Sequence, residues 1–180
     1  MHFAKKNLRN ILFFYLLHIK QIENKVKAKN IKRRKNMDYE YDYIATLTAD
    51  EKRIFVESFC CMVYADGNVA KEEIEFLKGI GKLYGIAEQD IVSILKNMNK
   101  DAIMERIGSI TERQKALQLV KELCYLANSD TGLDDREIDF IIDVAEKVNV
   151  DSEKLKQINK WVLDKIVLQK TGEIILETEK

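Results

Sequence analysis

Two pairs of carboxylates recur at one spacing in this chain of 180 residues. Asp66 is followed seven residues later by Glu73, and Asp130 is followed seven residues later by Glu137. The second pair lies 64 residues after the first. Carboxylate oxygens are the ligands that hard divalent cations prefer. If the four side chains converge, they predict a metal site for Ca²⁺, Mg²⁺ or Mn²⁺, with Asp66, Glu73, Asp130 and Glu137 as the metal ligands.

Each carboxylate stands in line with apolar side chains at helical spacing. Asp66 continues a stripe that includes Phe59, and Glu73 begins a stripe that includes Phe76. Such spacing places the members on one helix face, which we expect to point toward the core. An ionised carboxylate there loses hydration, and an Asp at the end of a helix also meets the negative end of the helix dipole. A bound cation would relieve both costs.

The apolar stripes repeat together with the carboxylates. In the first half they consist of Phe55, Phe59, Met62, Val63 and Asp66, then Glu73, Phe76, Leu77, Ile80 and Tyr84. In the second half they consist of Leu119, Leu123, Leu126, Ala127 and Asp130, then Glu137, Phe140, Ile141, Val144 and Val148. Because every position differs by 64 residues, the pattern predicts a tandem duplication. Packing of the two copies about a pseudo-twofold axis would bring the four carboxylates together.

Two further roles for the carboxylates stay open. Asp at a helix-ending turn and Glu in a first helical turn are ordinary capping residues, so free helix amides could satisfy them without a metal. Alternatively, a metal-dependent hydrolase would use one carboxylate as its general base. Such an enzyme lacks an obvious acid for the leaving group, because both histidines, His2 and His18, lie at the start of the chain.

Familiar metal sites do not match this spacing. An EF-hand loop needs a bidentate Glu at its twelfth position, where counting from Asp66 or Asp130 gives Leu77 or Ile141. The absence of histidine from 37–180 excludes the Glu-x-x-His motif of di-iron bundles.

The cysteines and central glycines are expected to be structural. Cys60, Cys61 and Cys124 lie in apolar runs and follow neither a disulfide nor a zinc pattern, which favours core positions and a reducing compartment. Gly79 and Gly81 fall inside a helical pattern with no strand before them, so we expect a close helix contact rather than a dinucleotide site.

Composition predicts an all-α fold, since the chain has no proline and only seven glycines. We expect a single bundle of about seven helices over 37–170. Capping boxes at Thr48 and Thr111 should begin two of them, and Asp151 or Ser152 should cap the last long helix. Two shorter helices are expected over 88–98 and 100–110. Beyond Gln169, a small hairpin and a frayed end are both compatible with the sequence, so we assign 171–180 as a tail.

The chain is strongly divided in charge. Residues 1–36 hold 11 Lys and Arg against one Glu, which leaves 19 basic and 29 acidic residues over 37–180, a net charge of −10. This acidity argues against nucleic acid as a partner and favours cations or basic surfaces.

The apolar run Ile11–Leu17 is too short to cross a membrane and no signal-peptide cleavage site follows it. A disordered basic leader, a start site placed too early, and peripheral contact with an anionic membrane remain open for 1–36.

The two carboxylate segments resemble the TerB-like family, which includes the tellurite-resistance protein TerB and the N-terminal domain of the DjlA co-chaperones. The segment 64–77 matches the pattern Ala-Asp-Gly-x-hydrophobic-x-x-x-Glu in full, whereas 128–141 departs from it at Ser129 and Thr131. The resemblance covers about 45–165. It implies an all-helical bundle with a metal-associated acidic site at Asp66, Glu73, Asp130 and Glu137. It also implies a role in bacterial stress or tellurite response, or as an accessory domain in protein assemblies. The J-domain is not implied, because the chain lacks His-Pro-Asp.

We therefore expect a non-enzymatic, cytoplasmic, TerB-like module that binds a divalent cation and engages a protein partner. A metal-free scaffold that only mediates assembly is the first alternative, and a metal-dependent hydrolase is the second.

Overall fold

The computed structural model describes residues 43–67, 69–128 and 135–176. The described residues form seven α-helices and two 3-10 helices, and no strand occurs among them. The all-α prediction is therefore confirmed. In chain order the elements are η1 (Tyr43–Thr46), α2 (Ala49–Val63), η2 (Tyr64–Asp66), α3 (Lys71–Tyr84), α4 (Glu88–Lys96), α5 (Lys100–Ile107), α6 (Arg113–Ala127), α7 (Asp135–Lys147) and α8 (Ser152–Leu176).

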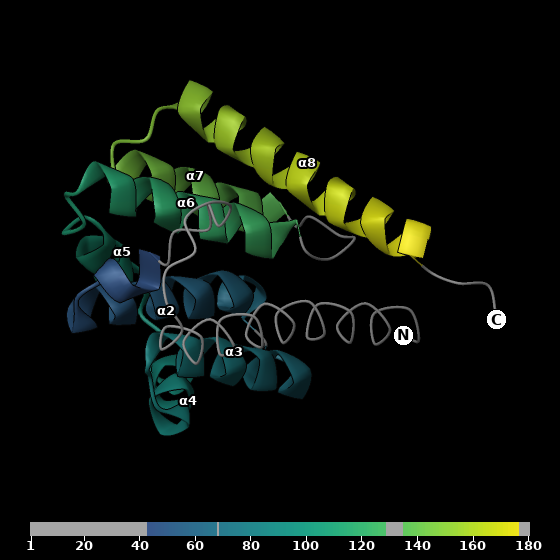
Figure 1. Cartoon of the computed structure of the whole chain (residues 1–180). Coiled ribbons are helices and arrows are strands. Elements are labelled where there is room, and N and C mark those ends of the chain that lie inside the picture. Colours follow the sequence, from purple (N-terminus) through teal and green to yellow (C-terminus); the bar gives the residue numbers. More distant parts are fainter. Residues whose placement is uncertain (1–42, 68, 129–134, 177–180) are drawn as a thin grey trace, which may run out of the picture.

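The helices form two layers (Figure 1). One layer contains α2, α3 and α4, and the other contains α6, α7 and α8. The layers meet where α2 packs on α6 and α7, and α5 also packs on both α2 and α7. The helix α2 thus lies at the centre of the molecule, which is consistent with the nearly complete burial of its residues 54–62.

Local sequence signals explain where most helices begin and end. The predicted capping box at Thr48 is present: its hydroxyl accepts a hydrogen bond from the Glu51 N–H (3.2 Å), and its own N–H donates to Glu51 Oε2 (2.7 Å). Asp151 Oδ1 accepts from the Lys154 N–H (2.8 Å) and caps α8. At the other ends, Gly67 and Gly85 adopt left-handed φ angles of 83° and 75°, which allow the chain to turn out of a helix.

The predicted capping box at Thr111 is wrong. The helix α6 begins one residue later than that motif requires, with Glu112 at the N-cap and no side-chain cap hydrogen bond. Arg113 contributes instead by donating from Nη1 to the Asn149 carbonyl (2.7 Å), a contact that ties the start of α6 to the end of α7. This helix start therefore has no side-chain cap, and a tertiary contact of its first residue connects it to the residues after α7.

The apolar stripes form the core as predicted. Members from all four stripes are buried, namely Phe55, Phe59, Met62, Phe76, Leu77, Ile80, Tyr84, Leu119, Leu123, Ala127, Phe140, Ile141, Val144 and Val148. The aromatic rings of Phe55, Phe59 and Tyr84 lie within 6.4 Å of one another, centroid to centroid. Val63 and Leu126 are only partly buried at the end of their helices.

The last helix is longer than expected. Residues 171–176 continue α8, so the hairpin interpretation is wrong for them. A single glycine inside a helix costs only about 1 kcal/mol, and Gly172 therefore does not end this one. The helices over 88–98 and 100–110 are shorter than expected and end at Lys96 and Ile107. Among the described residues, no helix is both long enough and apolar enough to span a bilayer.

Candidate functional site

The four predicted ligands are described to different extents. Asp66 is the last residue of η2, directly before the left-handed Gly67, but its side chain lies outside the described part of the structure. Asp130 lies outside the described residues altogether. Glu73 and Glu137 are each the third residue of a helix, α3 and α7, and both are half-buried. Asp66 therefore lies at a helix corner and the two glutamates lie in first turns, as the sequence predicted, whereas the position of Asp130 stays a prediction.

The Glu73 carboxylate caps its own helix. Its Oε2 accepts a hydrogen bond from the Ala70 N–H at 2.7 Å, while the alanine side chain offers no cap in return. An acidic side chain in the first turn also lies at the positive end of the helix dipole. The residue thus serves the amide-capping role that the sequence left open.

The fold brings the first corner close to the helix that carries the second glutamate. The 3-10 turn η2, which ends at Asp66, packs against α7, which begins two residues before Glu137. Within 43–67, 69–128 and 135–176, no group of three or more His, Cys, Asp or Glu side chains is arranged to hold a metal ion. The four-carboxylate site remains a prediction, because Asp130 and the Asp66 side chain are not among the side chains that the structure describes.

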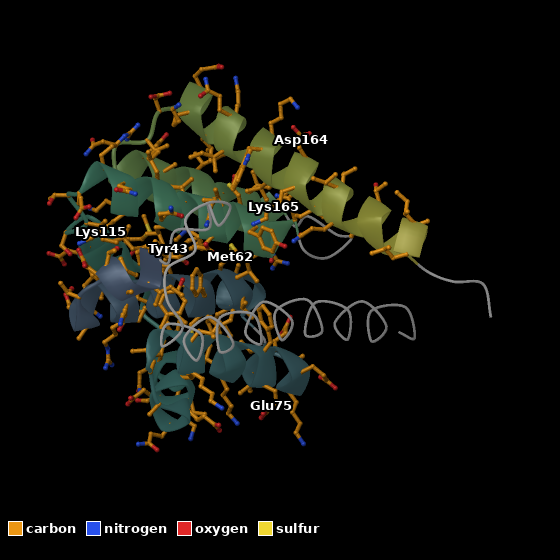
Figure 2. The ribbon with its side chains drawn as sticks, in the orientation of Figure 1. Tyr43, Met62, Glu75, Lys115, Asp164 and Lys165 are labelled. Atoms are coloured by element: carbon orange, nitrogen blue, oxygen red, sulfur yellow. The ribbon has the colours of Figure 1, made fainter. Side chains whose placement is uncertain are left out.

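At the opposite end of α2, an ion pair joins the first turns of α2 and α6. Lys115 Nζ lies 2.9 Å from Glu51 Oε1 and 3.0 Å from Glu112 Oε2 (Figure 2). Burial acts to raise the pKa of Glu51, but the hydrogen bonds from Thr48 and Lys115 outweigh it and the pKa is lowered. The same bonds to Glu51 and Glu112 raise the pKa of Lys115.

A second charged cluster, which the sequence did not predict, joins α2 to α5. The buried Glu57, 6% exposed, binds Arg106 of α5 and accepts from Arg53 Nε at 3.0 Å. Arg106 also reaches Asp50, with Nη2 2.5 Å from Oδ1. The i, i+4 spacing of Arg53 and Glu57 was visible in the sequence, but the partner Arg106 is 49 residues away. Because two guanidinium groups neutralise Glu57, this cluster holds α5 on α2 rather than offering a free acid.

The three cysteines are core residues, as predicted. Cys60, Cys61 and Cys124 are at most 5% exposed and form no disulfide. Burial raises the thiol pKa to about 12 for Cys60 and Cys124 and to about 11 for Cys61. A thiol with such a pKa is protonated at neutral pH and is a poor nucleophile.

A groove of about 780 Å³ between α6, α7 and α8 was not predicted. Its walls are mainly apolar and include Ala127, Ile138, Ile141, Ala145 and Leu155. Asparagine and charged side chains occupy its edge, where Asn128 Nδ2 donates to Asn159 Oδ1 at 2.8 Å. The groove is formed by residues from three helices, so no short sequence motif predicts it.

Comparison of the chain with protein-family models, curated proteins and solved structures found no match. The fold is therefore established by the structure of this chain alone, and its relation to the TerB-like family is a hypothesis.

Proposed function

We propose that this chain is a non-enzymatic, TerB-like helical module of the cytoplasm that binds a divalent cation and acts through a protein partner in bacterial stress response. The cation ligands would be Asp66, Glu73, Asp130 and Glu137. The observation that carries the proposal is the packing of η2 against α7, because it puts the corner that ends at Asp66 beside the helix that carries Glu137. Carboxylates from both halves of the chain would then share one ion.

The proposal includes a duplication with pseudo-twofold symmetry. In support of it, α2, α3 and α4 begin at residues 49, 71 and 88, whereas α6, α7 and α8 begin at 113, 135 and 152, each 64 residues later. The pair Glu51 and Lys115 also supports it, because these residues are separated by the same 64 positions. Side chains at equivalent positions of two copies meet only close to the symmetry axis between them.

Electrostatic repulsion among the four carboxylates supports a bound cation. The half-buried carboxylates of Glu73 and Glu137 would repel those of Asp66 and Asp130 if all four converged without a counter-ion. The net charge of −10 over 37–180 also raises the concentration of cations near the surface, which favours the same binding.

Calorimetric titration of the full chain with Ca²⁺, Mg²⁺, Mn²⁺ and Zn²⁺ tests the proposal. We expect binding heat with at least one ion, and its loss in Asp130→Asn and in Glu73→Gln. Glu72→Gln is the matched control, because Glu72 lies in the same first turn but is exposed. The absence of binding heat with all four ions would contradict the proposed cation site.

A metal-free scaffold is the second candidate, and the hydrogen bond from Ala70 to Glu73 favours it. That bond gives the carboxylate a structural use that needs no ion. In this case Glu73→Gln and Glu137→Gln would leave partner capture unchanged, and a chelator would not alter Tm. Loss of partner capture in both variants, with restoration by added cation, would reject the metal-free alternative.

A further inference from the structure

The groove between α7 and α8 exists because α8 packs differently from α4. The helix α4 packs mainly on α3, whereas α8 packs mainly on α6. In the first half, Gly81 allows Ile91 to approach so closely that a Cβ at Gly81 would lie 2.8 Å from Ile91 Cδ1. The residues 64 positions later are Ala145 and Leu155, and both line the groove. Ile91 is fully buried, but Leu155 is only partly covered.

The groove leaves apolar surface in contact with water. Ile142, at its edge, is 40% exposed, and the inner wall contains Ile138 and Ile141. Contiguous apolar surface of this kind marks a binding site in soluble proteins. The edge also carries the acidic side chains of Glu146 and Asp151, with Lys156 as a basic one. An occupant should therefore combine large apolar side chains with flanking positive charge.

We propose that the segment Ile11–Leu17 of the same chain occupies this groove. The segment is a run of seven apolar or aromatic residues, and it has Arg9 before it and Lys20 after it. Residues 1–36 carry 11 basic residues against one acidic residue, and the domain carries a net charge of −10. Opposite charges on the two parts of one chain favour their contact.

The point where this segment joins the domain allows it to reach the groove. Tyr43 is the first described residue, and Figure 2 shows it between the two layers. Lys121 Nζ of α6 lies 4.9 Å from the centroid of the Tyr43 ring. Lys121 is seven residues from Asn128 at the edge of the groove, or about 10 Å along the helix axis.

The connecting chain is long enough. Residues 18–42 separate Leu17 from Tyr43 and span at most about 80–90 Å, whereas a domain of this size has a radius of gyration of about 14 Å. A tether of this length would keep its segment at an effective concentration on the order of a millimolar. Even a weak apolar contact would then form mainly within one molecule. An external protein at micromolar concentration would compete poorly with it for the groove.

Photo-cross-linking of the full chain tests the proposal. A cysteine introduced as Ser152→Cys lies exposed on the groove and can be labelled with benzophenone maleimide. The native cysteines do not compete, because they are buried and protonated at neutral pH. The matched control is Glu88→Cys, which lies 64 residues earlier in the first turn of α4 and is also exposed.

After irradiation, we expect the label at Ser152→Cys to attach to the tryptic peptide 10–20 of its own chain, and the label at Glu88→Cys not to do so. Adding Leu16→Asp and Leu17→Asp should reduce this product at least about tenfold, because each change replaces an apolar side chain that the groove would bury with a charged one. Neither substitution changes a residue that lines the groove.

Three results would overturn the proposal. Equal attachment from both labelled sites, or none to peptide 10–20, would show that the segment does not select the groove. Attachment between two chains, seen as a covalent dimer, would make a second copy the occupant. Sedimentation of the full chain with vesicles of anionic phospholipid, together with absence of the cross-link, would assign the segment to a membrane surface.

Discussion

Glu51 performs two tasks with one carboxylate. It completes the capping box of α2 by accepting the Thr48 N–H, and it binds Lys115 at the start of α6. The ion pair with Lys115 needs the ionised form, and the negative charge also strengthens the hydrogen bond from Thr48, so the lowered pKa of Glu51 ties the folded state to pH. A group whose pKa is lower in the folded state contributes stability that is present above the unfolded pKa and disappears as pH falls through the folded pKa.

The first prediction concerns this pH dependence. The stabilisation from Glu51 should be complete above its ordinary pKa of 4.5 and should be lost at lower pH. The variant Glu51→Gln keeps an acceptor for the Thr48 N–H but not the charge. We expect it to have a lower urea midpoint than the parent chain at pH 7, and we expect this difference to be smaller at pH 3. Exposed Glu72→Gln is the control, and an equal deficit of Glu51→Gln at both pH values would contradict the prediction.

Two threonines that look alike in sequence should differ in their contribution to stability. Thr48 accepts a cap hydrogen bond, whereas Thr111 precedes a helix whose N-cap is Glu112. Thr48→Ala should therefore lower the free energy of unfolding by about 1 kcal/mol, and Thr111→Ala by less than about 0.5 kcal/mol. Urea denaturation followed by circular dichroism measures both. Equal losses would mean that the Thr111 hydroxyl caps α6 in solution.

At the scale of the element, α3 carries two glycines in different surroundings. A Cβ at Gly79 would meet no atom within 4 Å, whereas a Cβ at Gly81 would meet Ile91 of α4. The close helix contact expected from the sequence is therefore confirmed for Gly81 and wrong for Gly79. Only Gly81 lets α4 settle against α3, because its missing side chain makes room for the Ile91 methyl group.

This difference gives a matched pair of substitutions. Gly79→Ala should raise the free energy of unfolding by about 0.5–1 kcal/mol, because alanine favours the helix and nothing obstructs it. Gly81→Ala should forfeit that gain and destabilise the chain, because Ile91 must move within a close-packed core. Thermal unfolding of both variants checks the order. A higher Tm for Gly81→Ala than for Gly79→Ala would show that α4 yields easily.

Helix positions and core faces could be predicted because the signals that fix them are local. The signals that act within a few residues are the Thr48 box, the glycines after η2 and α3, and the spacing of Phe55, Phe59 and Met62. The start of α6 and the end of α8 could not be predicted. At the start of α6 the expected Thr111 cap is absent and Arg113 contacts Asn149, 36 residues away, and at the end of α8 the helix continues through Gly172.

The candidate sites divide in the same way. The corner and first-turn positions of Asp66, Glu73 and Glu137 follow from helix ends and were predicted. Whether the carboxylates share an ion depends on the packing of the two halves, which the sequence does not encode locally. The groove depends on where α8 lies relative to α7, and it became visible only when Ala145 and Leu155 could be compared with Gly81 and Ile91.

At the scale of the whole molecule, α2 connects the two layers. It packs on α3, α4 and α5 of the first part of the chain and on α6 and α7 of the second. Because its buried face is shared, the layers have no separate cores, and the buried apolar residues form one cluster. We therefore expect the described helices to unfold in a single cooperative transition.

A core substitution in one layer tests this cooperativity by its effect on the other. Phe59 of α2 is 1% exposed, and Phe59→Ala should lower the free energy of unfolding by about 3–5 kcal/mol. The single tryptophan, Trp161, lies on α8 in the opposite layer, so its fluorescence reports that layer, while circular dichroism reports all helices. We expect Phe59→Ala to lower the urea midpoint of both signals equally. If the fluorescence midpoint stayed at its parent value while the dichroism transition split in two, the two layers would unfold as independent units.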